Sequence, residues 1–265
     1  MADLSTTTRQ LVFLGSGTST GVPVLGCDCQ VCTSRDPRNQ RTRPSVLMRF
    51  PLGDLLIDTT PEMRLQLLRE HVGFVHAIAY THDHVDHLFG LDDARLFPKY
   101  LDGPVPIFCD EHTEQTIKRV FSYAFHERAQ AIPAGHLPKL RFERIAPAVP
   151  FRVLGQEIIP IRLEHGRFNV LGFRVGNLAY CTDVSKIPDE SWPLLEGLDV
   201  LILDALRHEP HPTHFSLVEA LNVIERLNPA RALLTHLSHG FDHGPTESTL
   251  PPRVRLAYDG LSLNF

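Results

Sequence analysis

Two short stretches of this chain concentrate side chains that bind metal ions. Residues 81–88, THDHVDHL, place three histidines and two aspartates within eight residues. Residues 27–32, CDCQVC, place three cysteines within six residues. Imidazoles, carboxylates and thiolates are the side chains that hold zinc and similar ions. Both stretches are therefore candidate metal sites.

The order H-x-H-x-D-H in the first stretch predicts two neighbouring ions. His82 and His84 are two residues apart, so on an extended backbone they point the same way and can grip one ion. Asp86 and His87 follow at a bend and can face a second ion. A pair of cations lowers the pKa of a shared water and orients a phosphate or acyl group for hydrolysis. The alternative is a polar loop that is rich in histidine by chance, which the order directly after an apolar run disfavours.

The three clustered cysteines raise a different question, because a closed zinc site needs four ligands and no fourth lies nearby. Cys109 and Cys181 are in apolar runs and are expected to be small buried side chains. A disulfide framework is not expected in a chain of this size without a secretory leader. Metal binding is the favoured interpretation of Cys27, Cys29 and Cys32, and a redox-active thiol cluster is the alternative.

Composition favours a soluble, cytoplasmic protein. The chain has 265 residues, is 43% hydrophobic and carries a formal charge of −5. The first ten residues, MADLSTTTRQ, contain no apolar run, and no run approaches the ~20 residues of a membrane span. The acidic charge disfavours nucleic acid and membrane surfaces as partners, although a local basic patch would still allow a nucleic acid. A homodimer is one option that the sequence leaves open.

The pattern of elements predicts the fold class. Apolar residues at i, i+3 and i+4 predict a helix over 215–228, and Thr60 followed by Pro61 predicts the start of another. Strands outnumber helices and precede them in both halves, which favours two mixed sheets packed face to face with helices outside. Residues 1–265 are expected to form one domain, with an insertion or lid at about 119–140. Strands are predicted at 11–14, 45–50, 54–58, 75–81, 141–145, 151–163, 170–175, 178–182 and 200–205.

The His-rich motif after an apolar strand resembles the metallo-β-lactamase superfamily. That resemblance implies an αββα sandwich and a two-metal site completed by residues far from the motif. His165 would join His82 and His84 on the first ion. Asp183 would bridge the two ions, and His236 would join Asp86 and His87 on the second. Asp58 would orient the His-rich loop.

A narrower resemblance concerns the cysteines. The stretch GSGTSTGVPVLGCDCQVC, followed by the His-rich motif and LTHLSH, looks like the phosphoribosyl cyclic phosphodiesterases of phosphonate breakdown. It covers about residues 10–265. If His236 serves the catalytic pair, His239 is free to complete a structural zinc site. The expected set is Cys27, Cys29, Cys32 and His239.

The same resemblance implies that His214 contacts phosphate or protonates the leaving group. Asp86, if it releases its metal, is a second candidate for that proton transfer. His208 and His211 lie close in sequence and are weaker candidates. The extra length around 119–140 puts the ribosyl cyclic phosphate in doubt, and His126 and His136 there are candidate lid residues.

The predicted function is hydrolysis of a small, cyclic or open phosphodiester by hydroxide held between two Mn²⁺ or Zn²⁺ ions, with one structural Zn²⁺. Two alternatives are an RNA-processing nuclease of the same superfamily and a non-catalytic metal-binding protein. Binding alone does not need an open two-metal site, which disfavours the last.

Overall fold

The computed structural model describes residues 9–265. The prediction that the N-terminus is not a signal peptide falls mainly on residues 1–8, which lie outside the described residues. Within residues 9–265, no helix has the length and apolarity needed to cross a membrane.

The first sheet is mixed and holds seven strands in the order β14-β1-β2-β3-β4-β5-β6. The pairs from β14 to β3 are antiparallel, and those from β3 to β6 are parallel. Its strands are β1 (Gln10–Gly15), β2 (Ser45–Phe50), β3 (Gly53–Ile57), β4 (Ala77–Ala79), β5 (Val105–Cys109), β6 (Leu140–Arg144) and β14 (Ser262–Asn264).

The second sheet is also mixed and has the order β13-β12-β11-β10-β9-β8-β7. Its pairs are antiparallel from β7 to β10 and parallel from β10 to β13. The strands are β7 (Phe151–Val153), β8 (Gln156–His165), β9 (Phe168–Val175), β10 (Leu178–Cys181), β11 (Val200–Asp204), β12 (Arg231–Thr235) and β13 (Val254–Leu256).

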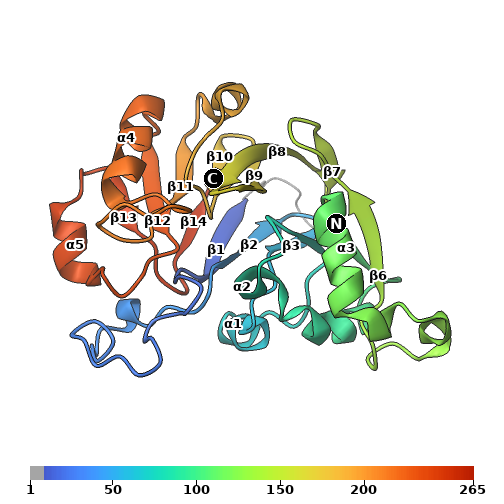
Figure 1. The fold of residues 1–265 in the computed structure, drawn as a ribbon. Helices are drawn as coiled ribbons and strands as arrows, with labels where there is room; N and C mark the ends of the chain where they lie inside the picture. Colours follow the sequence, from blue (N-terminus) through green and yellow to red (C-terminus); the bar gives the residue numbers. More distant parts are fainter. Residues whose placement is uncertain (1–8) are drawn as a thin grey trace, which may run out of the picture.

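The two sheets pack face to face and helices cover their outer faces (Figure 1). Side chains from both sheets, among them Phe13, Met48, Phe173 and Ile202, fill the layer between them and are almost fully buried. The predicted αββα sandwich is therefore confirmed. The α-helices are α1 (Met63–Arg69), α2 (Val85–Leu88), α3 (Glu111–Val120), α4 (Leu217–Leu227) and α5 (His243–Thr249), and the 3₁₀ helices are η1 (Pro37–Asn39), η2 (Leu91–Lys99), η3 (Ser122–Ala124), η4 (Glu127–Ala131) and η5 (Asp189–Leu195).

Each outer layer has its own apolar contacts. Helices α1 and α3 pack on the outer face of the first sheet through residues such as Leu67 and Ile117. Helix α4 packs on the second sheet through Ala220 and Ile224. Ser216 forms a capping box with Glu219 at its start, which fixes where the chain enters the helix.

Two local predictions were wrong. The helix after Thr60 begins at Met63, and the Thr60 hydroxyl donates to Gln66 Oε1 at 2.9 Å rather than capping the helix. The run 151–163 is a hairpin of β7 and β8, because Leu154 and Gly155 adopt positive φ angles and turn the chain back. Both errors come from turn chemistry, which apolar periodicity does not reveal.

The segment 119–140 contains the end of α3, η3, η4 and the start of β6. The ring of Phe125 packs 5.7 Å from that of Phe142 on β6. The Tyr123 hydroxyl donates to Asp92 Oδ1. These contacts hold the segment beside the first sheet, and its role as an insertion or lid stays a prediction.

Candidate dinuclear metal centre

The structure brings seven polar side chains together where strands of both sheets end. They form two groups that share Asp183, and the nitrogen and oxygen atoms that each group offers lie within 4.8 Å of one another. All seven are the residues that the sequence suggested for the paired site. The first group is His82, His84, His165 and Asp183, and the second is Asp86, His87, Asp183 and His236.

Sharp turns after three strands aim polar side chains at this point. Asp58 follows β3, Asp183 follows β10, and His236 follows β12, with φ angles of 65°, 58° and 60°. Residues other than glycine rarely adopt this left-handed conformation, and aspartate tolerates it better than most. Such backbone conformations persist where the surrounding structure enforces them, often at functional sites.

The imidazoles are held from behind by their Nδ1 atoms. His87 Nδ1 donates to Asp58 Oδ2 at 2.8 Å, and His165 Nδ1 donates to the Thr213 carbonyl at 2.6 Å. His82 Nδ1 lies 2.9 Å from Thr81 Oγ1, whose own proton goes to Asp58 Oδ2. These contacts leave Nε2 of each ring as the atom that faces the cluster.

The inward-facing atoms lack good partners. The Nε2 atoms of His82, His87 and His236 are buried without a well-directed hydrogen bond among the described residues. They lie 3.6, 3.3 and 3.2 Å from oxygens of Asp183. Because buried polar atoms are costly unless they are satisfied, this arrangement fits a bound cation. Imidazoles held through Nδ1 with Nε2 directed inward are typical of metal ligands.

The electrostatics of the cluster also fit a cation. Burial would raise the pKa of Asp183, but His236 and His87 hold that pKa well below its usual range. Burial opposes protonation of His236, but Asp183 leads the acidic neighbours that raise its pKa to about 9. Buried carboxylates surrounded by imidazoles in this way suit a divalent cation, which binds the neutral form of each ring.

A buried His–Asp pair stands beside the cluster. His214 Nδ1 donates to Asp204 Oδ2 at 2.9 Å, and the His214 ring centroid lies 4.6 Å from those of His165 and His236. The other oxygen of Asp204 lies 3.7 Å from His236 Nδ1. Asp204 therefore positions His214 and contacts the back of His236, and Nε2 of His214 is the ring nitrogen left for a substrate.

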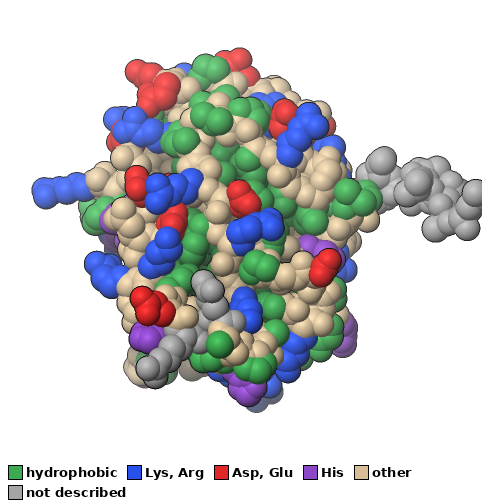
Figure 2. Space-filling view, turned by 90° about the vertical axis from the view of Figure 1, so that its right-hand side faces the viewer, with side chains coloured by type: hydrophobic (Ala, Val, Ile, Leu, Met, Phe, Trp, Pro, Cys, Tyr) green, Lys and Arg blue, Asp and Glu red, His purple; other side chains and the backbone are tan. Residues whose placement is uncertain are grey.

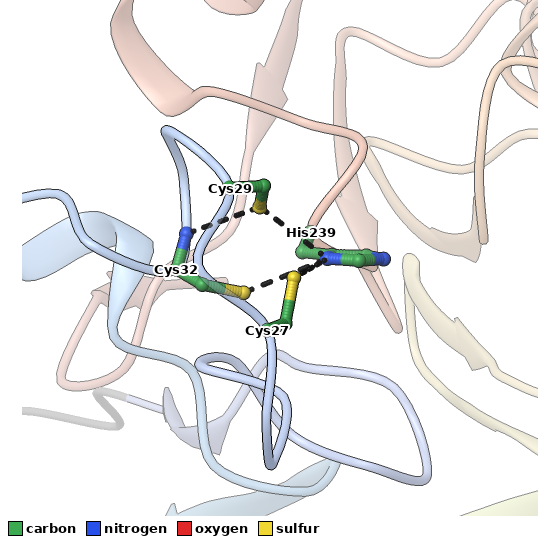
Figure 3. Close-up of side chains that lie close together, drawn as sticks. All are labelled: Cys27, Cys29, Cys32 and His239. Atoms are coloured by element: carbon green, nitrogen blue, oxygen red, sulfur yellow. Dashed lines mark hydrogen bonds between the residues drawn. The ribbon is translucent and has the colours of Figure 1, made fainter.

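A second cluster brings the three cysteines to His239 (Figure 3). The Sγ atoms of Cys27, Cys29 and Cys32 lie 3.3, 3.5 and 3.5 Å from His239 Nδ1. None of these cysteines is in a disulfide. The Cys32 backbone N–H lowers the pKa of Cys29 to about 6, and burial raises that of Cys32 to about 11. Three sulfurs and one nitrogen are the donor set of a closed structural zinc site.

A buried arginine ties the cysteine loop to the loop that holds both His236 and His239. Arg41 is 1% exposed, and its guanidinium donates to the carbonyls of Ser238 and Phe241 at 3.0 and 2.8 Å. Burial lowers the pKa of Arg41 to about 10. The two clusters are therefore joined through one short loop, in which their histidines are three residues apart.

Comparison with known proteins places this geometry in a family. A model described as "Beta-lactamase superfamily domain" matches residues 54–237, the range from β3 to just past His236. The chain belongs to the metallo-β-lactamase superfamily. This membership implies divalent metal ions, in agreement with the donor atoms of the two groups.

Individual relatives indicate the branch of the superfamily to which the chain is most similar. The solved structure of a diphosphatase from the PhnP family superimposes with a TM-score of 0.90 and 43% identity, covering 97% of each chain. An octanoyltransferase of Porphyromonas gingivalis is 34% identical over 256 residues, or 94% of this chain. This chain spans only 50% of that protein's length. A ribonuclease Z of Pyrobaculum neutrophilum is 24% identical over 269 residues, covering 86% of each chain. The metallo-β-lactamase member described here thus lies in a PhnP-like branch.

Other candidate histidines lie outside both metal groups. His211 is half-buried, and its ring centroid is 5.3 Å from that of His214. His208 is exposed and packs on Phe241. His126 and His136 are exposed on the 119–140 segment and belong to none of the metal-type groups among the described residues.

Sequence reasoning missed Asp204. Its signal was present, because Asp204 ends the apolar strand β11 as Asp58 follows β3. An aspartate that ends an apolar strand in this superfamily is a candidate for the site whenever its strand neighbours carry site residues. Strand β11 pairs with β10 and β12, which precede Asp183 and His236.

Proposed function

We propose that this metallo-β-lactamase member is a dinuclear metal-dependent hydrolase of small phosphodiesters and of the related diphosphate (phosphoanhydride) linkage. The observation that carries the proposal is the sharing of Asp183 between two groups in which the buried Nε2 atoms of His82, His87 and His236 have no hydrogen-bond partner in the described part of the chain. The similarity to a PhnP-family diphosphatase supports the phosphorus chemistry.

The seven clustered residues would hold the two ions in the two groups described above, with Asp183 between them. When bound, paired divalent cations supply Lewis-acid stabilisation of the phosphoryl oxygens and activate water at neutral pH. The chain itself supplies a rigid frame, because hydrogen bonds to Asp58, Thr81 and Thr213 fix the directions of three imidazoles. The choice between Zn²⁺ and Mn²⁺ stays a prediction.

His214 is proposed to deliver the proton that the departing alkoxide needs. Asp204 accepts the Nδ1 proton, so Nε2 is the atom that faces substrate and can carry a proton to it. Asp86, which belongs to the second metal group, is the alternative donor that the sequence suggested. Its carboxylate is held below its usual pKa, with His87 as the first neighbour opposing burial. A group so firmly ionised is a poor proton donor, which favours His214.

At the second cluster we propose one structural Zn²⁺ held by Cys27, Cys29, Cys32 and His239. The alternative, a redox-active thiol cluster, does not use His239. Zinc would hold the cysteine loop against the C-terminal loop of His236.

A cytoplasmic location and a homodimer also remain predictions.

A substrate panel tests the proposed reaction. Zinc- or manganese-reconstituted protein would be assayed with bis-(p-nitrophenyl) phosphate, a cyclic nucleotide, a ribosyl cyclic phosphate, a nucleotide diphosphate ester and an octanoyl thioester. We expect turnover of the phosphorus esters and little of the thioester. Good turnover of the thioester with no reaction of any phosphorus ester would overturn the proposal. It would favour acyl chemistry, as in the name of the octanoyltransferase relative.

The RNA-processing alternative has one specific support, the similarity to ribonuclease Z. Against it, Lys and Arg are interspersed with Asp and Glu on the face that carries α3 and β6, rather than gathered into a basic patch (Figure 2). Binding to tRNA at two salt concentrations separates the two functions. Tight binding that weakens steeply with salt would favour the nuclease.

A further inference from the structure

A cavity beside the first metal group is lined by an arginine and by an exposed phenylalanine. Resting on the proposed function, we propose that Arg167 binds a second phosphoryl group of the substrate and that Phe168 stacks on a planar ring. The preferred substrates would then be nucleotide-like diesters or diphosphates that carry an additional anionic phosphate.

The cavity measures about 500 Å³ and opens next to the paired site. His82 and His84 of the first group line it, and so do Arg167 and Phe168. This volume lies within the range of roughly 300–1,000 Å³ that small-molecule sites usually have. A substrate whose scissile phosphorus lies at the metals would therefore extend its remaining part into this cavity.

A tight hairpin places Arg167 two residues after His165 of the first metal group. His165, the last residue of β8, pairs directly with Phe168 of β9, so only Gly166 and Arg167 form the turn. Gly166 has a φ of +62°, and its N–H donates to Ser185 Oγ at 2.9 Å. Because the turn is short and anchored, the backbone of Arg167 stays close to His165, and its exposed side chain is left to the cavity and the solvent.

Two carboxylates, Asp83 and Asp110, also line the cavity, and both accept hydrogen bonds from α3. Asp110 caps the helix by accepting from the Thr113 N–H at 2.8 Å. Asp83 accepts from Thr116 Oγ1 at 2.7 Å and lies 3.3 Å from His112 Nε2. Arg167 has no ion-pair partner among the described residues.

The guanidinium of Arg167 is therefore available to an external anion. Arginine suits this role because its planar fork can donate two parallel hydrogen bonds to one phosphate.

Phe168 adds a ring surface at the rim. It is 60% exposed, and its ring centroid lies 5.7 Å from that of His84 at an interplanar angle of 81°. An exposed phenylalanine beside a cavity offers a face for a base, and stacking of this kind contributes binding without strict selectivity among bases.

The kinetic test compares two substrates that differ by one phosphate. These are the p-nitrophenyl ester of thymidine 5′-phosphate and the same ester with an added 3′-phosphate. We expect the wild type to prefer the second, and Arg167→Gln to lose about ten- to a hundredfold in kcat/KM on that substrate alone. Its activity on bis-(p-nitrophenyl) phosphate, which lacks both sugar and second phosphate, should be unchanged.

Matched variants isolate the contacts. Arg64→Gln removes an exposed arginine on α1, away from this cavity, and should leave the preference intact. Phe168→Leu should weaken both thymidine substrates relative to bis-(p-nitrophenyl) phosphate, and Phe168→Tyr should restore them. A wild type without preference, or an Arg167→Gln variant that loses activity equally on all three substrates, would overturn the inference and leave the hydrolase proposal standing.

A binding measurement covers the case in which no phosphorus ester is hydrolysed. Calorimetric titration of zinc-loaded protein would compare thymidine 3′,5′-bisphosphate with thymidine 5′-monophosphate. Binding of the bisphosphate that is about tenfold tighter, with the difference lost in Arg167→Gln, would support the inference even though the proposed reaction had failed. Equal binding of the two nucleotides would refute it.

Discussion

The two candidate metal clusters differ in how the chain builds them. The dinuclear cluster takes its residues from the ends of four strands, β4, β8, β10 and β12, or from the loops and the short helix α2 after them, in both sheets, and it is mostly buried. The cysteine cluster takes three of its four residues from one loop, and its residues are more exposed. The dinuclear cluster therefore depends on the packing of the whole sandwich, whereas the cysteine cluster depends on the contact between two loops.

The contacts behind the ligand atoms differ as well. Three imidazoles of the dinuclear cluster are fixed through Nδ1 by other residues, so the protein holds the site in shape. The sulfur atoms of the cysteine cluster contact mainly one another, His239 and nearby backbone N–H groups. We infer that metal at the first cluster serves chemistry in a preformed site, whereas metal at the second contributes to folding.

The largest effect is expected for Asp183, which both groups share. Asp183→Asn should lower turnover of bis-(p-nitrophenyl) phosphate by about a thousandfold or more, because it weakens both metal positions. Steady-state kinetics and metal content by mass spectrometry would measure this. Asp189→Asn, an exposed aspartate at the start of η5, is the control. Full activity with two bound metals in Asp183→Asn would show that Asp183 is not the shared ligand of the two metal positions.

The loss of activity on replacing His214 should depend on how readily the leaving group departs without a proton. His214→Gln should lower kcat by about a hundredfold on an alkyl diester, which needs a proton on its leaving oxygen, and much less on p-nitrophenyl esters. The ratio of the two rates is the measurement, and His208→Gln is the control. Equal losses on both substrates would indicate that His214 only shapes the pocket.

Asp58 tests whether the site is preformed. Asp58→Asn removes the charge that orients His87 and should cost about ten- to a hundredfold in metal affinity or activity. Competition with a zinc chelator, followed by circular dichroism to check the fold, would measure the affinity. If affinity is unchanged, the contrast drawn between the two clusters is wrong.

A substitution in the cysteine cluster should lower stability more than activity. Cys32→Ser should remove one zinc per chain and lower the unfolding temperature, while the folded fraction keeps activity within about tenfold of the wild type. Cys109→Ser, a substitution at a buried cysteine of β5, is a control for the loss of a thiol. A Cys32→Ser variant with normal zinc content and stability would favour a redox role for the thiols.

The smallest effect is expected on folding stability, at an ion pair that lies outside both metal clusters. A hydrogen bond from Arg144 lowers the pKa of Glu114, whose side chain is 6% exposed. A carboxylate with a lowered pKa in the folded state adds stability above its unfolded pKa and loses it as the pH falls. Glu114→Gln should therefore be slightly less stable at neutral pH, with the difference vanishing in acid. Denaturant titration at several pH values would measure it, and a constant difference would contradict this account.

Local spacing predicted part of the site and of the fold. The H-x-H-x-D-H order pointed to two ions without any tertiary information, and apolar runs located most strands. The family resemblance added Asp58, His165, Asp183 and His236, which carry no local signature of their own. Turn chemistry at Thr60 and at Leu154 misled the prediction of a helix start and of a strand.

The amino-acid sequence by itself determined which side chains could bind metal and which segments would be strands, because both follow from residue type and short periodicity. Only the tertiary structure decided that Asp204 holds His214 and that Arg167, which has no ion-pair partner within residues 9–265, lines a cavity. These two facts depend on where strands and turns distant in sequence come to lie once the two sheets pack. Packing across the sandwich fixes those positions, and no local pattern encodes them.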